Sequence, residues 1–251
     1  MEENRPIVMS IAGLDPCGGA GLLADIKTFE QHKVYGLSIA TAQTLQTDTQ
    51  FFSLRWEATN DILYGIEKMV SQYNVQVVKI GIVKNIQVLN QIISLIKTIN
   101  ESIKIVVDPV IKSSTGFNFW DNMDQALLFE IFSKIFLLTP NYDEALQLFP
   151  SENAKASALK LSNYCNVLLK GGHNKEEVGV DYLFTKNEVE KISATIKNIY
   201  PKHGSGCVLS SAIAANIALG FDLSSSCKKA KLYIEQFLIS NKTLLGYHYV
   251  Q

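Results

Sequence analysis

Cysteine is scarce in this sequence, and its few copies are far apart. The 251 residues include Cys17, Cys165, Cys207 and Cys227, with no C-x-x-C pair and no histidine at zinc-finger spacing. Disulfide frameworks and structural zinc sites both need closely patterned ligands. The pattern argues against both and predicts four free thiols, whose default role is that of a small buried hydrophobic side chain.

An excess of one charge and long apolar runs are also missing. The 23 basic residues nearly balance the 24 acidic ones, so there is no global signal for nucleic acid or an anionic membrane. No basic start precedes an apolar segment, and no run of about 18 uncharged apolar residues occurs. We therefore expect a cytoplasmic protein without signal peptide or membrane span, which binds a small molecule.

The glycine motifs of two common nucleotide folds are absent as well. Neither G-x-G-x-x-G nor G-x-x-x-x-G-K-[ST] occurs in the sequence. A dinucleotide-binding domain or a P-loop fold is therefore not expected.

Short apolar runs alternate with helical patterns along the chain. Strands are expected at 5–15, 34–45, 75–83, 104–110, 135–141 and 167–172, with a hairpin at 180–192. Helices are expected at 19–33, 62–70, 85–99, 122–133, 143–149 and 156–164, and from about Gly206 and Leu223. This alternation is typical of βαβ units with right-handed crossovers. We expect residues 1–251 to form one α/β domain with a mainly parallel sheet covered on both faces.

In such sheets, ligands gather beyond the carboxyl ends of the strands. Here the ends are rich in polar residues and glycine. The strand ends are residues 13–15, 43–48, 79–81, 108–110, 139–141 and 170–172, and the loop 203–207 is expected at the same edge. The sequence therefore predicts a ligand site at this edge.

The loop "HGSGC", residues 203–207, has the components of an anion-binding site, and we call it the anion loop. Its glycines let successive N–H groups converge, and the following helix adds the positive end of its dipole. A thiol at such a helix N-terminus is expected to have a lowered pKa. An ordinary loop-to-helix turn with Cys207 as a packing residue is the alternative.

Three other segments each allow two interpretations. Gly18–Gly21 is either a phosphate-suited turn before a helix or a simple tight turn, with Asp25 as a solvated helix residue. Asn141 and Glu144 either hold Mg²⁺ through oxygen atoms or water, or form a capping box. Lys170 either clamps a phosphate or is a solvated lysine at a strand end.

Taken together, seven ordered segments are typical of one kinase family. They read "SIAGLDPCGGAGLLADIKTF", "VYGLSIATAQTLQT", "KIGIV", "VVDPV", "LLTPNYDEA", "LLKGGH" and "HGSGCVLSSAIAANIALG". From about Ile7 to Gly220 the chain resembles the hydroxymethylpyrimidine/phosphomethylpyrimidine kinases of thiamin biosynthesis, which have the ribokinase-like three-layer α/β/α fold. The resemblance implies transfer of the ATP γ-phosphoryl group to 4-amino-5-hydroxymethyl-2-methylpyrimidine and then to its monophosphate, by a homodimer that uses ATP and Mg²⁺.

The resemblance also implies roles for individual residues. It assigns Gly13, Asp25 and Gln46 to the pyrimidine, whose ring nitrogens and amine suit a carboxylate and an amide. It assigns Asp108, Asn141 and Glu144 to Mg²⁺ and phosphate, with Asp108 and Glu144 as metal ligands. It assigns Lys170, Gly204, Ser205, Gly206 and Cys207 to catalysis. Cys207 stands where the wider fold carries a catalytic aspartate, and acts as base or as part of the anion hole.

Several positions depart from the family pattern. Leu14 replaces Ser or Thr, and Ser114–Gly116 replaces Lys-Ser-Gly, although Lys112 lies nearby. The segment "IYPKHGSGC" differs from the usual Lys-Asn/Asp-Thr-His, and no Gly-His-Gly tail follows Tyr247. These changes affect the ATP side and lid closure more than the pyrimidine side.

Two other functions compete with this one. A pyridoxal kinase of the cysteine-bearing subtype shares the fold, but places an apolar residue where Gln46 stands and lacks the "KGGH" pattern. A pyrimidine-binding protein without catalysis would account for the departures. The joint presence of five residues argues against it: Asp108, Asn141, Glu144, Lys170 and Cys207.

Overall fold

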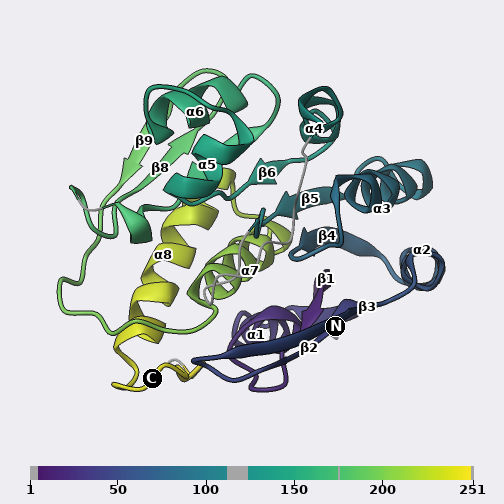
Figure 1. The fold of residues 1–251 in the computed structure, drawn as a ribbon, viewed down its shortest axis with the longest axis horizontal. Helices are drawn as coiled ribbons and strands as arrows, with labels where there is room; N and C mark the ends of the chain where they lie inside the picture. Colours follow the sequence, from purple (N-terminus) through teal and green to yellow (C-terminus); the bar gives the residue numbers. More distant parts are fainter. Residues whose placement is uncertain (1–4, 112–123, 175, 250–251) are drawn as a thin grey trace.

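The computed structural model describes residues 5–111, 124–174 and 176–249. Within these residues, nine strands form one sheet in the order β3-β2-β1-β4-β5-β6-β7-β8-β9 (Figure 1). The strands are β1 (Ile7–Leu14), β2 (Tyr35–Gln46), β3 (Phe51–Trp56), β4 (Val75–Ile80), β5 (Lys104–Val107), β6 (Leu137–Leu138), β7 (Asn166–Leu169), β8 (Asp181–Phe184) and β9 (Val189–Ile192). The strands from β2 to β7 in this order run parallel, and the edge pairings β2–β3, β7–β8 and β8–β9 are antiparallel. The predicted mainly parallel sheet is confirmed.

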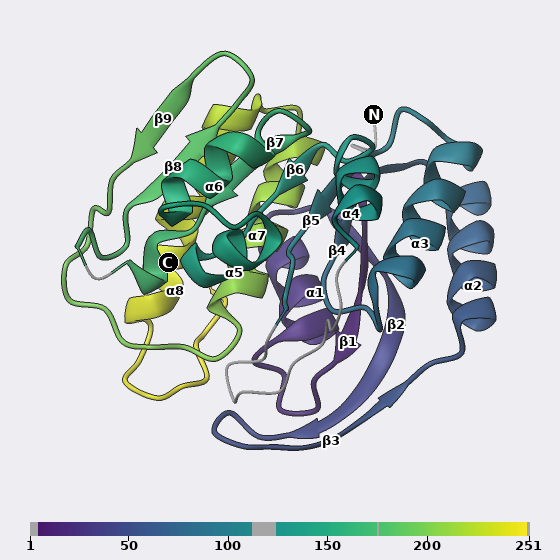
Figure 2. The same cartoon turned by 45° about the horizontal axis from the view of Figure 1, so that its top comes forward.

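Helices cover both faces of the sheet. One face carries α2 (Thr59–Gln72), α3 (Ile86–Ile99), α4 (Gln125–Phe132), α5 (Tyr142–Leu148) and α6 (Ala154–Leu161). The other carries α1 (Gly21–Gln31), α7 (Ser205–Ala218) and α8 (Leu223–Ile239). Figure 2 shows α2 and α3 on one side of β4 and β5, with α7 and α8 on the other. A short 3₁₀ turn, η1 (Gly171–His173), follows β7.

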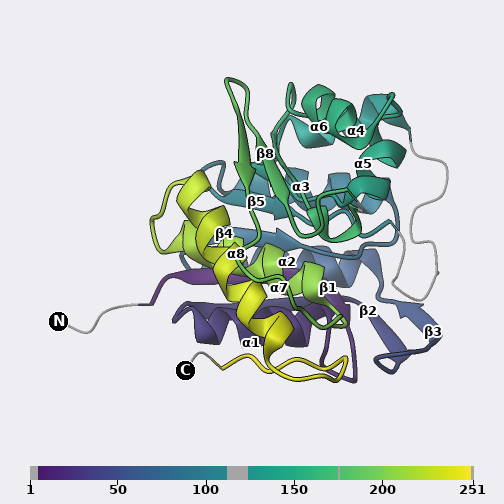
Figure 3. The ribbon, with the colours of Figure 1, turned by 90° about the vertical axis from the view of Figure 1, so that its left-hand side faces the viewer.

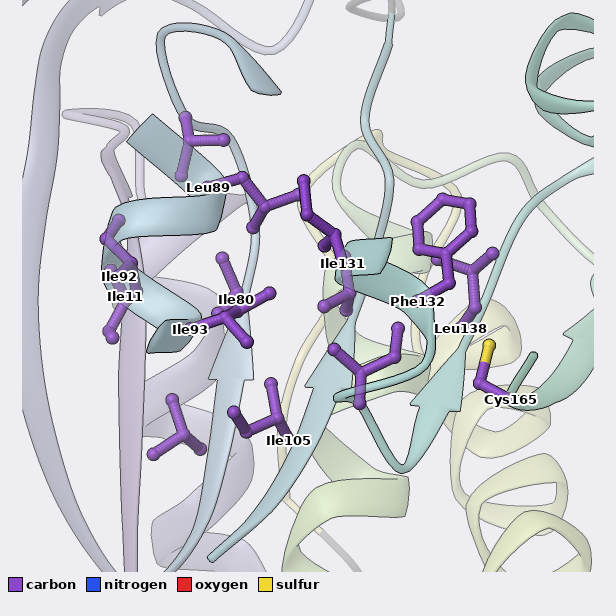
Figure 4. Close-up of a cluster of buried hydrophobic side chains, with 14 of the residues drawn as sticks. Ile11, Ile80, Leu89, Ile92, Ile93, Ile105, Ile131, Phe132, Leu138 and Cys165 are labelled. Carbon is purple, nitrogen blue, oxygen red and sulfur yellow. The ribbon is translucent and has the colours of Figure 1, made fainter. Parts of the chain in front are cut away.

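Alternate residues of each central strand supply the two cores. In β1, Val8 faces α1, α7 and α8, whereas Met9 and Ile11 face the five-helix side. Figure 4 shows part of the five-helix core, in which Ile80 and Ile105 of the sheet meet helix residues. Burying one such side chain contributes about 1.5–3 kcal/mol, so this double covering stabilises the strands despite their short length.

Cysteine behaves in this core as the default role predicts. Cys165 is buried beside Leu138, and burial raises the pKa of its thiol to about 12. Cys227 is buried in the opposite core.

One strand was not predicted. β3 pairs only with β2, in antiparallel fashion, as the edge of the sheet, and much of it is exposed. Among the described residues, no helix is long and apolar enough to cross a membrane.

Candidate active site

A charged cluster lies where β5 and β7 end. Asp108 follows β5 and Lys170 follows β7, and β6 separates these strands in the sheet. Lys170 Nζ lies 2.6 Å from Asp108 Oδ1 and 3.9 Å from Glu144 Oε2. Thr139 Oγ1 donates a hydrogen bond of 3.2 Å to Asp108 Oδ1. The two carboxylates are buried, whereas the Lys170 side chain is 12% exposed and reaches the surface.

The cluster holds more negative than positive charge. Burial opposes ionisation of Asp108, but Lys170 and Lys79 outweigh it and lower its pKa. Burial raises the pKa of Glu144 to about 7, and Asp108 adds to this shift while Lys170 opposes it. One ammonium ion shared between two carboxylates leaves Glu144 without full compensation, so a further cation would be stabilised here.

The capping-box interpretation of Asn141 and Glu144 is confirmed. The Glu144 N–H donates to Asn141 Oδ1 at 2.9 Å, and the Asn141 N–H donates to Glu144 Oε2 at 2.7 Å. The cap fixes the start of α5 and aims the Glu144 carboxylate at Lys170. The side-chain oxygen of Asn141 is engaged in the cap, so a direct role of Asn141 toward Mg²⁺ or phosphate stays a prediction.

The anion loop joins this cluster through its glycines. Gly204 has a left-handed φ of 74°, and a Cβ there would lie 2.0 Å from the Gly19 carbonyl oxygen. A Cβ on Gly206 would lie 3.4 Å from Lys170 Nζ and 3.7 Å from Asp108 Oδ2. Glycine at 204 therefore lets the loop pack on Gly19 and Ala20, and the side chains of Lys170 and Asp108 lie beside Gly206.

The N-terminus of α7 is left open by its sequence. No side chain of a described residue caps it, and the Val208 N–H donates the first bond of the helix, to Gly204 O. The N–H groups of Ser205, Gly206 and Cys207 precede that bond, as unpaired N–H groups do at any helix start. They are available to an anion beside Lys170.

Cys207 is a half-buried residue on the first turn of α7, and the surroundings of its thiol favour the neutral form. Burial raises its pKa to about 11, although Lys79 and the Gly21 N–H group act in the opposite direction. The predicted lowering of the pKa is therefore wrong, because desolvation and the nearby Asp25 and Asp108 outweigh Lys79 and the Gly21 N–H group. Cys17, in the loop before α1, also has its pKa raised to about 11 by burial. Cys207 therefore differs from Cys17 in its position at the start of α7 and not in the charge of its thiol.

Asp25 forms a fully buried ion pair that the sequence analysis missed. Lys79 Nζ lies 3.0 and 2.9 Å from the two carboxylate oxygens, and both side chains are 0% exposed. Ser10 and Ser211 donate to the same carboxylate at 2.5 and 2.7 Å. The alternative of a solvated Asp25 is wrong. Contact of Asp25 with a pyrimidine stays a prediction, since both oxygens already accept hydrogen bonds.

Ser210 and Ser211 carry the polar face of α7 one turn beyond Cys207. Ser210 Oγ donates to Asp108 Oδ2 at 3.3 Å, while Ser211 reaches Asp25. The available sequence signals were the "SS" pair one turn after Cys207 and the lysine within the apolar strand "VQVVKI".

A second polar contact joins the two glycine-rich loops. Asp15 Oδ2 accepts hydrogen bonds from His203 Nε2 at 3.0 Å, Cys17 Sγ at 3.1 Å and Ala20 N–H at 2.8 Å. Burial opposes ionisation of Asp15, but these bonds outweigh it and lower its pKa. Asp15 thus holds the loop before α1 against the anion loop.

Gly13 and Gln46 lie at the ends of β1 and β2. Gly13 sits at a bulge between these strands, and a Cβ there would lie 2.4 Å from Ile82 Cδ1. The half-buried Gln46 makes no side-chain hydrogen bond with another described residue, so its amide is free to bind a ligand. Lys112 and Ser114–Gly116, in contrast, lie outside the described residues.

The arrangement suits the binding and transfer of an anionic group. The start of α7 offers N–H groups and the Cys207 thiol, and the Lys170 ammonium lies beside them with the partly compensated Glu144 carboxylate. The sequence model of the phosphomethylpyrimidine kinase family matches residues 15–250. The chain belongs to this family.

Two curated relatives agree with this membership. The chain is 32% identical to the hydroxymethylpyrimidine/phosphomethylpyrimidine kinase of Aquifex aeolicus, over 95% of this chain and 96% of that protein. It is 32% identical to the hydroxymethylpyrimidine/phosphomethylpyrimidine kinase THI20 of Saccharomyces cerevisiae, over 93% of this chain. The match covers 46% of the yeast protein, so the chain spans about half the length of that relative.

Solved structures show the same fold. The phosphomethylpyrimidine kinase of Clostridium difficile 630 has a TM-score of 0.77 at 30% identity, over 92% of this chain and 98% of that one. The Staphylococcus aureus pyridoxal kinase in complex with AMP-PCP and pyridoxal has a TM-score of 0.81 at 22% identity, over 94% and 88%. The latter likeness shows the fold alone. The predicted resemblance, the ribokinase-like fold and the kinase class are confirmed, and this class implies ATP use.

Proposed function

We propose that this family member transfers the γ-phosphoryl group of ATP to the hydroxymethyl oxygen of 4-amino-5-hydroxymethyl-2-methylpyrimidine, and then to the resulting monophosphate. The observation that carries the proposal is the approach of Lys170 and Asp108 to Gly206 at the uncapped N-terminus of α7. Open N–H groups and an ammonium ion at one point stabilise the charge of a transferring phosphoryl group.

In this proposal Lys170 neutralises phosphate charge and the anion loop binds phosphate oxygens. Cys207 stands nearest the acceptor oxygen. Its thiol is neutral, so it donates a hydrogen bond or relays a proton and does not act as a resident thiolate. Phosphoryl transfer through a loose transition state depends chiefly on positioning and charge neutralisation, which makes such a weak base sufficient.

We also propose Asp108 and Glu144 as the residues that hold Mg²⁺, directly or through water. Carboxylate oxygens are the ligands that Mg²⁺ prefers. The raised pKa of Glu144 supports the assignment, because a nearby dication would compensate its charge. When bound, Mg²⁺ would supply neutralisation of the phosphate oxygens.

For the pyrimidine we propose Gly13, Gln46 and Asp25. The free amide of Gln46 at the end of β2 can pair with the polar edge of the ring. Asp25 has one of two roles there. Either it makes a polar contact with the ring, or it fixes α7 through its bonds to Lys79 and Ser211.

We further propose a cytoplasmic homodimer. Both parts of this proposal follow the family, and an ATP-using enzyme with four free thiols fits a reducing compartment. Sedimentation of the purified protein tests the dimer.

A coupled assay tests the proposed function. The purified protein is given ATP, Mg²⁺ and either hydroxymethylpyrimidine, its monophosphate or pyridoxal. We expect kcat/KM for hydroxymethylpyrimidine to exceed that for pyridoxal at least tenfold, equivalent to about 1.4 kcal/mol. Equal or reversed preference would favour the pyridoxal kinase alternative, and pyrimidine binding without any phosphorylation would favour the non-catalytic one.

A further inference from the structure

Lys202, immediately before the anion loop, is a buried lysine without a counter-ion. It is 7% exposed, and its ammonium forms no ion pair with a carboxylate of a described residue. The other lysines buried near the site or in the core are paired. They form the pairs Lys79–Asp25, Lys170–Asp108 and Lys231–Asp181. A buried charge without a counter-ion is costly unless other groups solvate it fully.

Neutral oxygen atoms solvate this ammonium. Lys202 Nζ donates to the carbonyl oxygens of Asn241 and Thr243, both at 2.6 Å, and to Asn241 Oδ1 at 3.1 Å. These three oxygens, which we call the oxygen cage, use all three N–H groups of the ammonium. Burial lowers the pKa of Lys202, as expected for a cation with no carboxylate beside it.

The segment after α8 supplies all three oxygens of the oxygen cage and has hydrogen bonds of its own. Asn241 Oδ1 also accepts from the Thr243 N–H at 2.8 Å, and Asn241 Nδ2 donates to the Leu245 carbonyl oxygen at 2.9 Å. These bonds hold the carbonyl groups in place. The three neutral oxygens therefore offer lone pairs to a compact monovalent cation, as they do to the Lys202 ammonium.

The same segment forms one wall of the anion loop. The His203 N–H donates to the Leu244 carbonyl oxygen at 2.9 Å, next to the oxygen cage. On the other side, Gly204 packs on Gly19 and His203 bonds to Asp15. Figure 3 shows the segment after α8 returning beside the chain that leads into α7. The position of the anion loop therefore depends on what fills the oxygen cage.

We propose that Lys202 is a positioning residue, a tethered cation that fills a site for a monovalent cation of the size of K⁺ or NH₄⁺ and thereby fixes the anion loop. The cation is covalently attached, so the protein needs no exchangeable ion at this place. The kinetic consequence rests on the proposed function, whereas the binding of an ion to the emptied oxygen cage does not.

A thermal experiment without substrate tests the site. Lys202→Ala opens the oxygen cage to solvent, and Lys202→Met fills it with an apolar chain. Melting temperatures are measured in NH₄Cl, KCl and tetramethylammonium chloride at equal ionic strength. We expect NH₄⁺ or K⁺ to raise the melting temperature of Lys202→Ala by about 3 °C over tetramethylammonium, with no such difference for Lys202→Met or the unaltered protein. An equal response of all three proteins, or no selective response of Lys202→Ala, would overturn the proposal.

A kinetic experiment tests the effect on the anion loop. We expect kcat of Lys202→Ala to fall about tenfold in tetramethylammonium and to recover in NH₄⁺, while the unaltered protein does not respond to the ion. Lys202→Gln keeps N–H donors but loses the charge, and full kcat of this variant would overturn the proposal.

If Lys202→Ala folds only with NH₄⁺ or K⁺, the proposal is supported. If it folds in no salt, the rate of Lys202→Gln decides. A protein without kinase activity would refute the proposed function, and the thermal experiment would still test the ion site.

Discussion

At the residue scale, the chemistry of Cys207 is set by what surrounds it. Burial raises the pKa of the thiol, and the nearby Asp25 and Asp108 add to this effect, whereas Lys79 and the Gly21 N–H group favour a thiolate. The effects that raise the pKa are larger, and the thiol stays neutral at physiological pH. Alkylation should therefore be slow for a residue at a helix N-terminus.

The pH dependence of alkylation tests this balance. Because the pKa is raised to about 11, the thiolate fraction of Cys207 should rise about tenfold per pH unit between pH 7 and 10. An ordinary exposed cysteine levels off above about pH 8.5. Peptide mass spectrometry after iodoacetamide treatment follows Cys207 separately from Cys17. A plateau below pH 8 would show that the helix N-terminus wins. ATP with substrate should slow the labelling.

The catalytic role of the thiol is tested by Cys207→Ala. We expect kcat to fall by about 10² to 10⁴, the usual effect of removing a positioned acid or base, with little change in pyrimidine affinity. Steady-state kinetics and pyrimidine titration separate the two quantities. Full turnover, with a loss of stability of about 1 kcal/mol, would instead make Cys207 a packing residue.

Single residues also show where sequence reasoning stops. The position of Cys207 at a helix start follows from "HGSGC", and the capping box follows from the spacing of Asn141 and Glu144. The charge state of Cys207 and the burial of Asp25 do not. The pKa of Cys207 is set by burial and by distant charged residues, and Asp25 pairs with Lys79, 54 residues further along the chain. The burial of Lys202 was not predicted for the same reason, because its hydrogen-bond partners lie in the segment after α8.

At the element scale, the Lys79–Asp25 pair joins four elements behind the anion loop. Lys79 lies in β4, Asp25 in α1, Ser10 in β1 and Ser211 in α7. The pair is fully buried, so each charge depends on the other for compensation. This connection joins α1 to α7 within the first two turns of each helix.

Removing one charge of this pair should destabilise the fold strongly. We expect Lys79→Met to lower the free energy of unfolding by about 3–5 kcal/mol, because it leaves Asp25 buried and uncompensated. The double variant Lys79→Met/Asp25→Asn should be more stable than Lys79→Met alone. Urea unfolding measures both.

A matched control uses a surface pair. Lys134→Met breaks the exposed pair with Glu130 and should change the free energy by about 0–1 kcal/mol. A comparably small effect of Lys79→Met would mean that water or neighbouring groups compensate Asp25.

Element prediction succeeded where each element carries its own periodic pattern. The hairpin β8–β9 and the helices α1, α3, α7 and α8 follow their expected ranges closely. β3 was missed because "FFSLRW" is a short, largely exposed edge strand that pairs with β2 among the described strands. Pairing with β2, rather than any pattern of its own, makes this segment a strand.

At the scale of the whole molecule, the sheet order separates the proposed tasks. Gln46 ends β2, whereas Lys170 follows β7, five positions away in the order β2-β1-β4-β5-β6-β7. Neighbouring strands lie about 4.8 Å apart, so about 24 Å of sheet separates these positions. Between them α7 packs over β1, β4 and β5 and brings Cys207 to the middle. The proposed pyrimidine residue Gln46 and the proposed phosphate residue Lys170 thus lie on opposite sides of one edge.

This separation predicts independent effects of Gln46→Met and Lys170→Met. Gln46→Met should weaken use of hydroxymethylpyrimidine by about 1–3 kcal/mol, since polar groups of the bound ring lose their partner, and leave the ATP constant nearly unchanged. Lys170→Met should impair phosphoryl transfer and ATP use, with a smaller effect on pyrimidine binding. In the double variant the two free-energy changes should add within about 0.5 kcal/mol, as expected for sites that share no partner. Measuring kcat/KM for each substrate in all four proteins completes the cycle. An ATP constant that shifts with Gln46→Met as much as the pyrimidine constant does would place Gln46 outside the pyrimidine site, and strong non-additivity would show that the two sides of the edge act as one unit.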